Sequence, residues 1–152
     1  MAEEAIDLAD ERATLELGRA IAGHLRIGDV VALEGGLGAG KTTLTRGILE
    51  ALGLEGEAPS PSFALVQPYD VPEVRLPVTH VDLYRIDDPA EIAELALDDY
   101  LIDSLLVIEW PERLGDGLWP HALRLHMDMM PEGGRRLTAS LPEDWKERWS
   151  QI

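Results

Sequence analysis

The feature that most constrains this chain is a glycine-rich segment, GGLGAGKT, at residues 35–42. It fits the pattern G-x-x-x-x-G-K-[ST] of a phosphate-binding loop, or P-loop. A short apolar run at residues 30–33 precedes it, and a helical pattern at residues 41–52, stopped by Gly53, follows it. A strand and a helix joined by such a loop form a framework in which backbone N–H groups bind phosphate. The segment therefore predicts an α/β domain that binds a nucleotide.

The residue types in the loop indicate how it would hold a nucleoside triphosphate. Glycines allow the torsions that turn successive N–H groups into one concavity at the helix N-terminus. Lys41 places a positive charge between the β- and γ-phosphates, and Thr42 offers a hydroxyl to Mg²⁺. The nucleotide-binding residues expected in the loop are Leu37, Gly38, Ala39, Gly40, Lys41, Thr42 and Thr43.

A P-loop also needs a carboxylate near its metal, at the end of a neighbouring strand. Two candidates are available, because Asp82 lies near the end of a predicted strand at residues 78–83 and Glu109 follows a predicted strand at residues 105–108. His80, on the first of these strands, either acts on water or the γ-phosphate or is a structural residue. The residue types alone leave both choices open.

The remaining pattern predicts one α/β domain over residues 1–152, with a core at about residues 6–141 and a short polar C-terminal tail. We expect a mostly parallel central sheet flanked by helices, with antiparallel strands near the C-terminus. Three further helices are expected: one at 10–25 capped by Asp10, one that begins at Asp88 and runs to about Leu97, and a short one in the tail. The other expected strands are one at 63–67 and a hairpin of two, at 122–127 and 136–141, with its turn at 131–134.

Composition excludes several classes of function. Thirteen basic against 29 acidic residues give a net charge of −16, which favours a basic partner or a nucleotide with its magnesium over direct binding of nucleic acid. The chain contains no cysteine, which excludes disulfides, thiolate zinc sites and a cysteine nucleophile. It also contains no asparagine, which excludes the Asn-Lys-x-Asp element of guanine-specific GTPases. Neither a signal peptide nor a membrane-spanning apolar run is found, so we expect a cytoplasmic protein that does not act at a membrane.

Four motifs, in order along the chain, resemble those of one family. They are the P-loop at residues 35–43, Ser-Pro-Ser-Phe at 60–63, His-Val-Asp-Leu-Tyr-Arg at 80–85 and Ile-Glu-Trp-Pro-Glu at 108–112. Over about residues 6–140 the chain is similar to the bacterial TsaE (YjeE) family, ATPases required for the threonylcarbamoyladenosine (t6A) modification of tRNA at position 37. The resemblance implies a compact P-loop fold, Mg²⁺-dependent hydrolysis of ATP, and action with a TsaB–TsaD complex in which TsaD performs the transfer and tRNA is contacted only indirectly.

The resemblance also implies roles for single residues. Lys41 falls on the phosphate-binding lysine, Thr42 on the magnesium-binding hydroxyl and Glu109 on the second metal ligand. Asp82 falls on an essential acidic position, a candidate for activating or orienting water, so Lys41 and Asp82 are the expected catalytic residues. Three further residues fall where the family contacts the nucleotide: Glu11, Glu112 and Arg135.

Two positions depart from the family pattern, and one other function stays open. Gly36 stands where an aspartate is usual, and Ser62 replaces a threonine but keeps its hydroxyl. Trp110, beside Glu109, either faces the nucleotide or a partner, or packs in the core. The alternative function is a stand-alone small-molecule kinase. Its lid would need arginines, which Arg113, Arg135 and Arg136 supply, and a long insert, which the chain does not provide.

Overall fold

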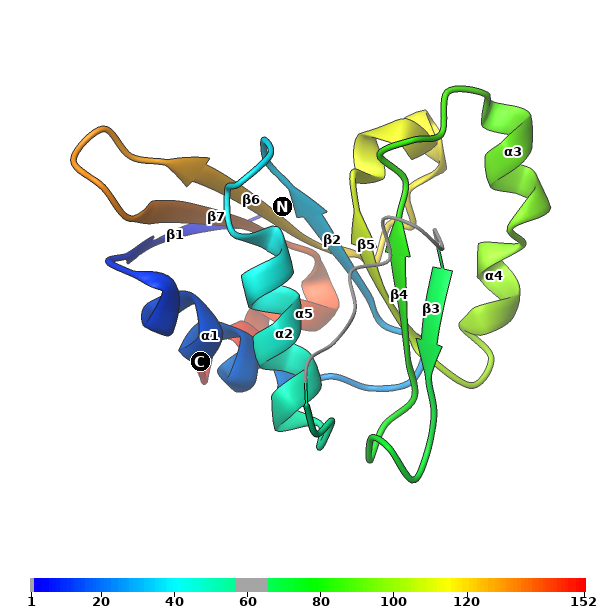
Figure 1. Ribbon diagram of the computed structural model, residues 1–152, viewed down its shortest axis with the longest axis horizontal. Helices are drawn as coiled ribbons and strands as arrows, with labels where there is room; N and C mark the ends of the chain where they lie inside the picture. Colours follow the sequence, from blue (N-terminus) through cyan, green and yellow to red (C-terminus); the bar gives the residue numbers. More distant parts are fainter. Residues whose placement is uncertain (1, 57–65) are drawn as a thin grey trace.

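The computed structural model describes residues 2–56 and 66–152, and this part of the chain forms one mixed sheet with helices on both faces (Figure 1). The strands are β1 (Ala2–Leu8), β2 (Val30–Glu34), β3 (Val66–Tyr69), β4 (Val78–Asp82), β5 (Leu105–Glu109), β6 (Leu123–Met129) and β7 (Arg135–Leu141). The helices are α1 (Glu11–Ala22), α2 (Lys41–Ala51), α3 (Pro89–Glu94), α4 (Leu97–Tyr100), the 3-10 helix η1 (Pro111–Gly117) and α5 (Glu143–Ser150).

The sheet has seven strands in the order β1-β7-β6-β2-β5-β4-β3. Its centre is parallel, because β2 pairs in parallel with both β5 and β6, and β5 pairs in parallel with β4. Both edges are antiparallel, with the β6–β7 hairpin and β1 on one side and β3 on the other. The predicted fold class, a largely parallel sheet with antiparallel strands near the C-terminus, is confirmed.

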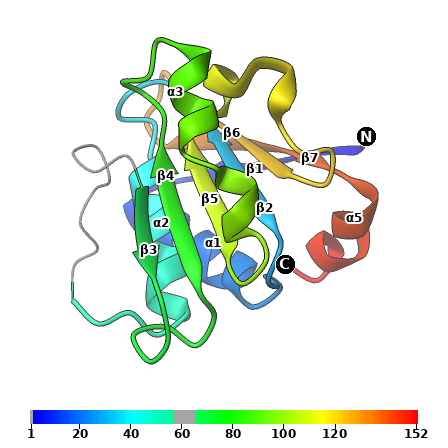
Figure 2. The same cartoon turned by 90° about the vertical axis from the view of Figure 1, so that its right-hand side faces the viewer.

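The two faces of the sheet bury different helices. Leu33 and Val107 belong to a cluster with side chains of α1, α2 and α5, whereas Val81 and Ile108 pack with side chains of α3, α4 and η1. Figure 2 shows α3 and α4 in front of the sheet and α1 and α2 behind it. Alternation along the strands then fixes the faces of the polar residues, because successive side chains of a strand point to opposite sides.

Helices α1 and α2 cross closely because each contributes a glycine at the contact. A Cβ atom on Gly18 of α1 would meet the carbonyl oxygen of Leu44, and one on Gly47 of α2 would meet the carbonyl oxygen of Leu15. Both would be nearer than real Cβ atoms approach a neighbouring atom. The close crossing places the start of α1 beside the P-loop, which begins α2.

The N-terminal strand β1 is missing from the sequence-based expectations. Three of its seven residues are acidic, and only Leu8 is buried. The strand is nevertheless fixed by seven registered pairs with β7, from Ala2 opposite Leu141 to Leu8 opposite Arg135. Pairing with a strand far away in the sequence, rather than a local hydrophobic pattern, therefore stabilises β1.

Three other elements differ in detail from the expectations. The single helix predicted from Asp88 is divided into α3 and α4, because Ala96 takes a left-handed conformation with φ of 49°. Strand β3 runs to Tyr69 and includes Pro68, which an edge strand tolerates because one side of its backbone is unpaired. The start of the strand predicted at 63–67 and the Ser-Pro-Ser-Phe motif lie outside the described residues.

The expected polar tail contains helix α5, which packs on the body of the protein. Trp145 and Trp149 are both buried in the cluster that includes α1 and α2. Arg148 of α5 donates to both carboxylate oxygens of Asp29, at 2.8 and 3.2 Å, and to the carbonyl of His24 at 2.8 Å. The inner side of the tail therefore carries two buried tryptophans and one buried arginine that is paired with a carboxylate.

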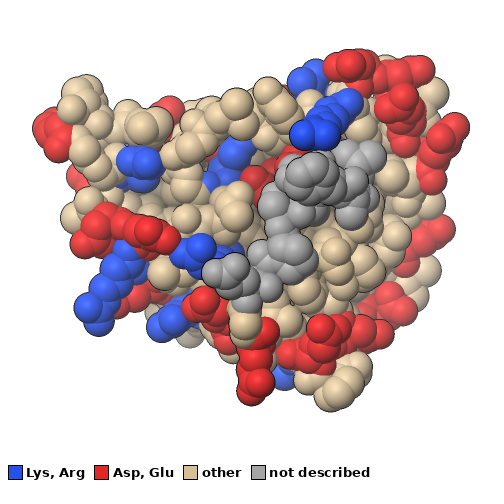
Figure 3. Space-filling view, in the orientation of Figure 1, with Lys and Arg blue, Asp and Glu red and all other residues tan. Residues whose placement is uncertain are grey.

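Charge is unevenly distributed over the surface. In the space-filling view acidic side chains gather along the edge that α3 and α4 form (Figure 3). The exposed acidic residues of this acidic edge are Asp87, Asp88, Glu91, Glu94, Asp98 and Asp99. Among the helices in the described ranges, none has the length and apolar character needed to cross a lipid bilayer.

Candidate functional site

The P-loop has the backbone geometry that a phosphate-binding loop requires. Gly38 and Gly40 both have positive φ, at 77° and 107°, so that side chains would be strained there. Gly40 is also the N-cap of α2, and no side chain caps the first turn of this eleven-residue helix. Free N–H groups at a helix N-terminus, together with the helix dipole, attract an anion.

Lys41 is held inside the site rather than extended into solvent. The residue is 5% exposed, and its Nζ donates to the carbonyl of Gly35 at 2.8 Å. The same nitrogen lies 3.8 Å from the ring centroid of Trp110, a cation–π contact. Burial lowers the pKa of Lys41, and the nearby carboxylates of Glu109, Glu112 and Asp82 oppose this shift by favouring the charged form.

Asp82 and Glu109 end neighbouring parallel strands and lie opposite each other in register. Val78 and Val107 on the same two strands belong to the cluster beneath α2, so both carboxylates face α2 and its lysine. Both residues are buried, with 8% and 4% of their surface exposed. Asp82 accepts a hydrogen bond from the backbone N–H of Tyr84 at 2.9 Å. The choice that the sequence left open is thus not exclusive, because both carboxylates reach the site.

His80 lies two residues before Asp82, on the same face of β4. Its Nε2 is 2.7 Å from Oε2 of Glu109, and both side chains are almost fully buried. Because a carboxylate only accepts hydrogen bonds, Nε2 carries the proton in this pair. The histidine therefore contacts a carboxylate of the site rather than pointing into the open pocket.

One pocket brings these groups together at the carboxyl ends of β4 and β5. We call it the strand-end pocket; it is lined by Leu37, Gly38, Gly40, Lys41, Thr42, Thr43, Asp82, Tyr84, Arg85, Glu109 and Trp110. The hydroxyl and carboxylate oxygens of Thr42, Asp82 and Glu109 are hard ligands of the kind that Mg²⁺ prefers. The donor set therefore fits a magnesium ion bound together with phosphate.

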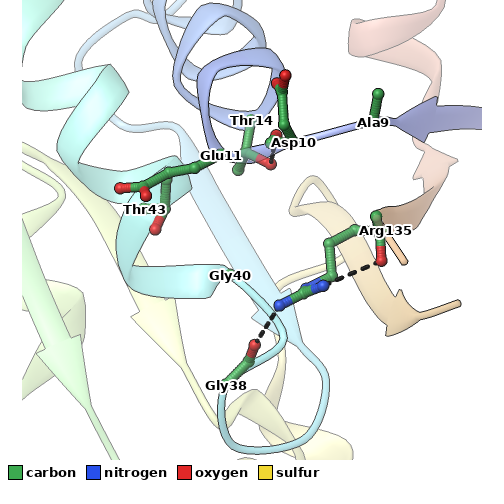
Figure 4. Close-up of a pocket in the computed structure, with 9 residues that line it drawn as sticks. Ala9, Asp10, Glu11, Thr14, Gly38, Gly40, Thr43 and Arg135 are labelled. Carbon is green, nitrogen blue, oxygen red and sulfur yellow. Dashed lines mark hydrogen bonds between the residues drawn. The ribbon is translucent and has the colours of Figure 1, made fainter.

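A second pocket lies on the other side of the loop, between α1 and β7 (Figure 4). We call it the α1-side pocket; it is lined by Ala9, Asp10, Glu11, Thr14, Gly38, Gly40, Thr43, Gly134 and Arg135. Arg135 reaches across from β7 and donates to the carbonyls of Gly38 and Ala39 at 3.0 and 3.1 Å. Glu11 is exposed and pairs with Arg46 of α2 at 2.6 Å.

Most of the residues expected at the site from the sequence line one of the two pockets. Two are absent from both linings: Ala39, a loop residue whose exposed fraction is only 2%, and Glu112, which is exposed on η1. Asp10 and Thr14 also line the α1-side pocket, which the sequence pattern does not predict. That pattern predicts Asp10 only as a helix cap, and no local motif indicates that α1 lies against the loop.

Trp110 packs in the core and also faces the pocket, although the sequence suggested these two roles as alternatives. It has φ of 61°, an unusual left-handed conformation for a bulky residue, and its ring lies 4.8 Å from the ring of Tyr84. The side chain packs partly against the core and also lines the strand-end pocket, over Lys41. The left-handed conformation of Trp110, directly after Glu109, is not predicted by any pattern in the sequence.

The comparison with known families decides the relationship. Residues 8–137 match the family model described as "Threonylcarbamoyl adenosine biosynthesis protein TsaE". The chain belongs to the TsaE family. The matched range contains every residue that lines the two pockets, so the family relationship covers the whole candidate site.

Individual TsaE proteins support this relationship. The chain is 46% identical to the tRNA threonylcarbamoyladenosine biosynthesis protein TsaE of Streptomyces coelicolor over 114 residues, which cover 74% of this chain and 77% of the relative. It is 40% identical to the protein of the same name from Haemophilus influenzae over 121 residues, which cover 76% and 75%. The crystal structure of Bacillus subtilis YdiB has the same fold, with a TM-score of 0.83, 24% identity, and coverage of 99% of this chain and 93% of that one.

Proposed function

We propose that this TsaE family member binds ATP with Mg²⁺ at the P-loop, hydrolyses it, and through this cycle supports the t6A modification of tRNA together with TsaB and TsaD. The observation that carries the proposal is the strand-end pocket, where Lys41, Thr42, Asp82 and Glu109 line one space. Family membership supports the assignment of the pathway.

Lys41 and the loop backbone would bind the phosphates. The ammonium lies in a buried setting, where an electrostatic contact is stronger than in water. The N–H groups at the start of α2 have no side-chain cap and would also bind phosphate. Together they would neutralise charge that develops on the transferred phosphoryl group.

Thr42 and Glu109 would hold the metal. Mg²⁺ in such sites keeps waters and phosphate oxygens and takes only one or two ligands from the protein. Bound there, the ion would offset the negative charge of the phosphates. Thr42 at the start of α2 and Glu109 at the end of β5 line the same pocket from two sides, which suits this shared coordination.

Asp82 would orient the attacking water. Its Oδ1 is held by the N–H of Tyr84, so the carboxylate is fixed at the strand end rather than free to turn. A fixed acceptor close to the γ-phosphate position is what hydrolysis needs from a water-positioning group.

The nucleoside would lie in the α1-side pocket. This pocket shares Gly38, Gly40 and Thr43 with the strand-end pocket, so a nucleotide whose phosphates follow the loop would reach both. Glu11 and Arg135 line it, in line with their expected contacts with the nucleotide. Glu112 stands apart from both linings, and its expected contact with the nucleotide stays a prediction.

The test is a measurement of phosphate released from ATP, with Mg²⁺ and with EDTA, by the chain alone and with TsaB and TsaD. We expect release that requires Mg²⁺ and increases when the two partners are added. A stand-alone kinase would instead convert ATP to ADP without free phosphate, and only when its acceptor is present. No binding of ATP, or turnover indifferent to Lys41→Ala, would contradict the proposal.

A further inference from the structure

The buried contact between His80 and Glu109 is an unusual feature of the strand-end pocket. The two side chains are 2% and 6% exposed, and the distance from Nε2 to Oε2 is 2.7 Å. Among the described residues, the other ring nitrogen, Nδ1, is buried and has no hydrogen-bond partner. The bond to Glu109 is therefore the hydrogen bond that the histidine ring makes in this part of the protein.

The contact involves one of two neighbouring carboxylates at the strand ends. Asp82 and Glu109 are register partners on one face, and two negative groups so placed repel each other. Each is held by a different donor: Asp82 by the N–H of Tyr84 and Glu109 by the ring of His80. Glu109 thus has an orientation that a ring packed in the sheet sets for it.

We propose that His80 is a positioning residue for the metal ligand: its Nε2–H binds Oε2 of Glu109 and orients the carboxylate toward Mg²⁺ bound with the nucleotide. The inference rests on the proposed function, since it takes Glu109 as a magnesium ligand. Side chains that hydrogen-bond a metal ligand commonly fix its orientation, and losing them lowers metal affinity by about ten- to a hundredfold.

Two substitutions of His80 test this inference, and they differ in whether the new side-chain amide can reach Glu109. Glutamine in His80→Gln places an amide nitrogen near the position of Nε2 and keeps the bond to Glu109. Asparagine in His80→Asn is shorter, so its amide corresponds to Nδ1 and the bond is lost. Thr79→Val is the matched control, because it removes another buried hydrogen bond of β4, the 3.1 Å contact with Ser104, on the opposite face of the strand.

The probe is a fluorescent ADP analogue, mant-ADP, titrated in EDTA and at increasing Mg²⁺. Mg²⁺ is expected to increase the affinity for mant-ADP. We expect His80→Asn to raise the Mg²⁺ concentration that gives half of this increase by about tenfold, while the affinity for mant-ADP in EDTA stays at the wild-type value. His80→Gln and Thr79→Val are expected to follow wild type. Equal losses in the glutamine and asparagine variants, or wild-type Mg²⁺ dependence in His80→Asn, would overturn the inference.

Two further arms separate this inference from the proposed function. If Glu109→Ala has the Mg²⁺ dependence of wild type, Glu109 is not a ligand, and the metal assignment and the inference both fail. If Glu109→Ala loses that dependence and His80→Asn keeps it, only the inference fails.

A measurement on the wild-type protein covers the case in which His80→Asn does not fold. The Nε2–H resonance of His80 in nitrogen-15 NMR spectra should shift when Mg²⁺ is added to the ADP complex, because its acceptor becomes a metal ligand. An unchanged resonance at saturating Mg²⁺ would overturn the inference.

Discussion

Lys41 carries a buried positive charge without a direct counterion in the described part of the chain. Its ammonium contacts a carbonyl oxygen and an aromatic ring, and burial lowers its pKa. A bound triphosphate would supply the negative partner that these contacts lack. Such a partner would offset the cost of burying the ammonium group.

Replacing this lysine tests its role in turnover. We expect Lys41→Ala to reduce phosphate release from ATP by about a hundredfold or more, because a charge aimed at the transition state is lost. The matched control is Lys146→Ala, which removes the other lysine, on the exposed side of α5 where it pairs with Glu143. Comparable losses in both variants would show that general charge, not the P-loop, causes the effect.

The sequence predicted the residues of the site better than the contacts between them. The loop, Asp82 and Glu109 are found where motif and strand pattern placed them. The bond from His80 to Glu109 depends on the register of β4 against β5, and the stacking of Trp110 on Lys41 depends on one left-handed residue. Neither the register between two strands nor one strained backbone torsion produces a repeating pattern of residues that could be recognised in a sequence.

At the scale of elements, the crossing of α1 and α2 controls the shape of the α1-side pocket. We expect Gly47→Ala to lower the free energy of unfolding by about 2 kcal/mol, because the added methyl meets the backbone of α1. Chemical denaturation measures this. Gly23→Ala, at the end of α1 with an ordinary φ of −63° and no close contact, is the control and should be nearly neutral. A neutral Gly47→Ala would contradict the close crossing.

Helix α5 is joined to the body by the ion pair between Arg148 and Asp29, whose side chains are 9% and 10% exposed. We expect Asp29→Ala to destabilise the protein by about 3 kcal/mol, since it leaves a buried guanidinium without its carboxylate. Arg12→Ala, which breaks the exposed pair with Glu16, should hardly move the denaturation midpoint. Equal midpoints for the two variants would mean that the buried pair does not hold α5 in place.

The elements that the sequence predicted are those with a strong local pattern. The segments at β2, α2 and β5 have uniform buried runs or helical spacing, and they form where expected. Strand β1 and the division between α3 and α4 have no such pattern. The first depends on pairing with β7, a tertiary contact, and the second on the left-handed conformation of one residue, Ala96.

At the scale of the whole molecule, we expect the net charge to oppose direct binding of tRNA. The chain has a net charge of −16, and part of the negative charge lies on the acidic edge along α3 and α4. We expect the isolated chain to bind tRNA weakly, because repulsion between its acidic surface and the phosphates outweighs the few contacts that basic residues can make. This repulsion still acts between nearby charges at physiological ionic strength, where the Debye length is about 8 Å. Fluorescence anisotropy at moderate salt measures this. Submicromolar binding that weakens steeply with salt would contradict the expectation.

The most direct test is reconstitution of t6A formation on tRNA with TsaB, TsaD and a donor of the threonylcarbamoyl group, with this chain as the variable component. The account predicts that multiple rounds of modification need the wild-type chain, ATP and Mg²⁺, and that Lys41→Ala fails to replace it while Lys146→Ala succeeds. Full modification without the chain, or with Lys41→Ala in its place, would contradict the claim that its P-loop site serves this reaction.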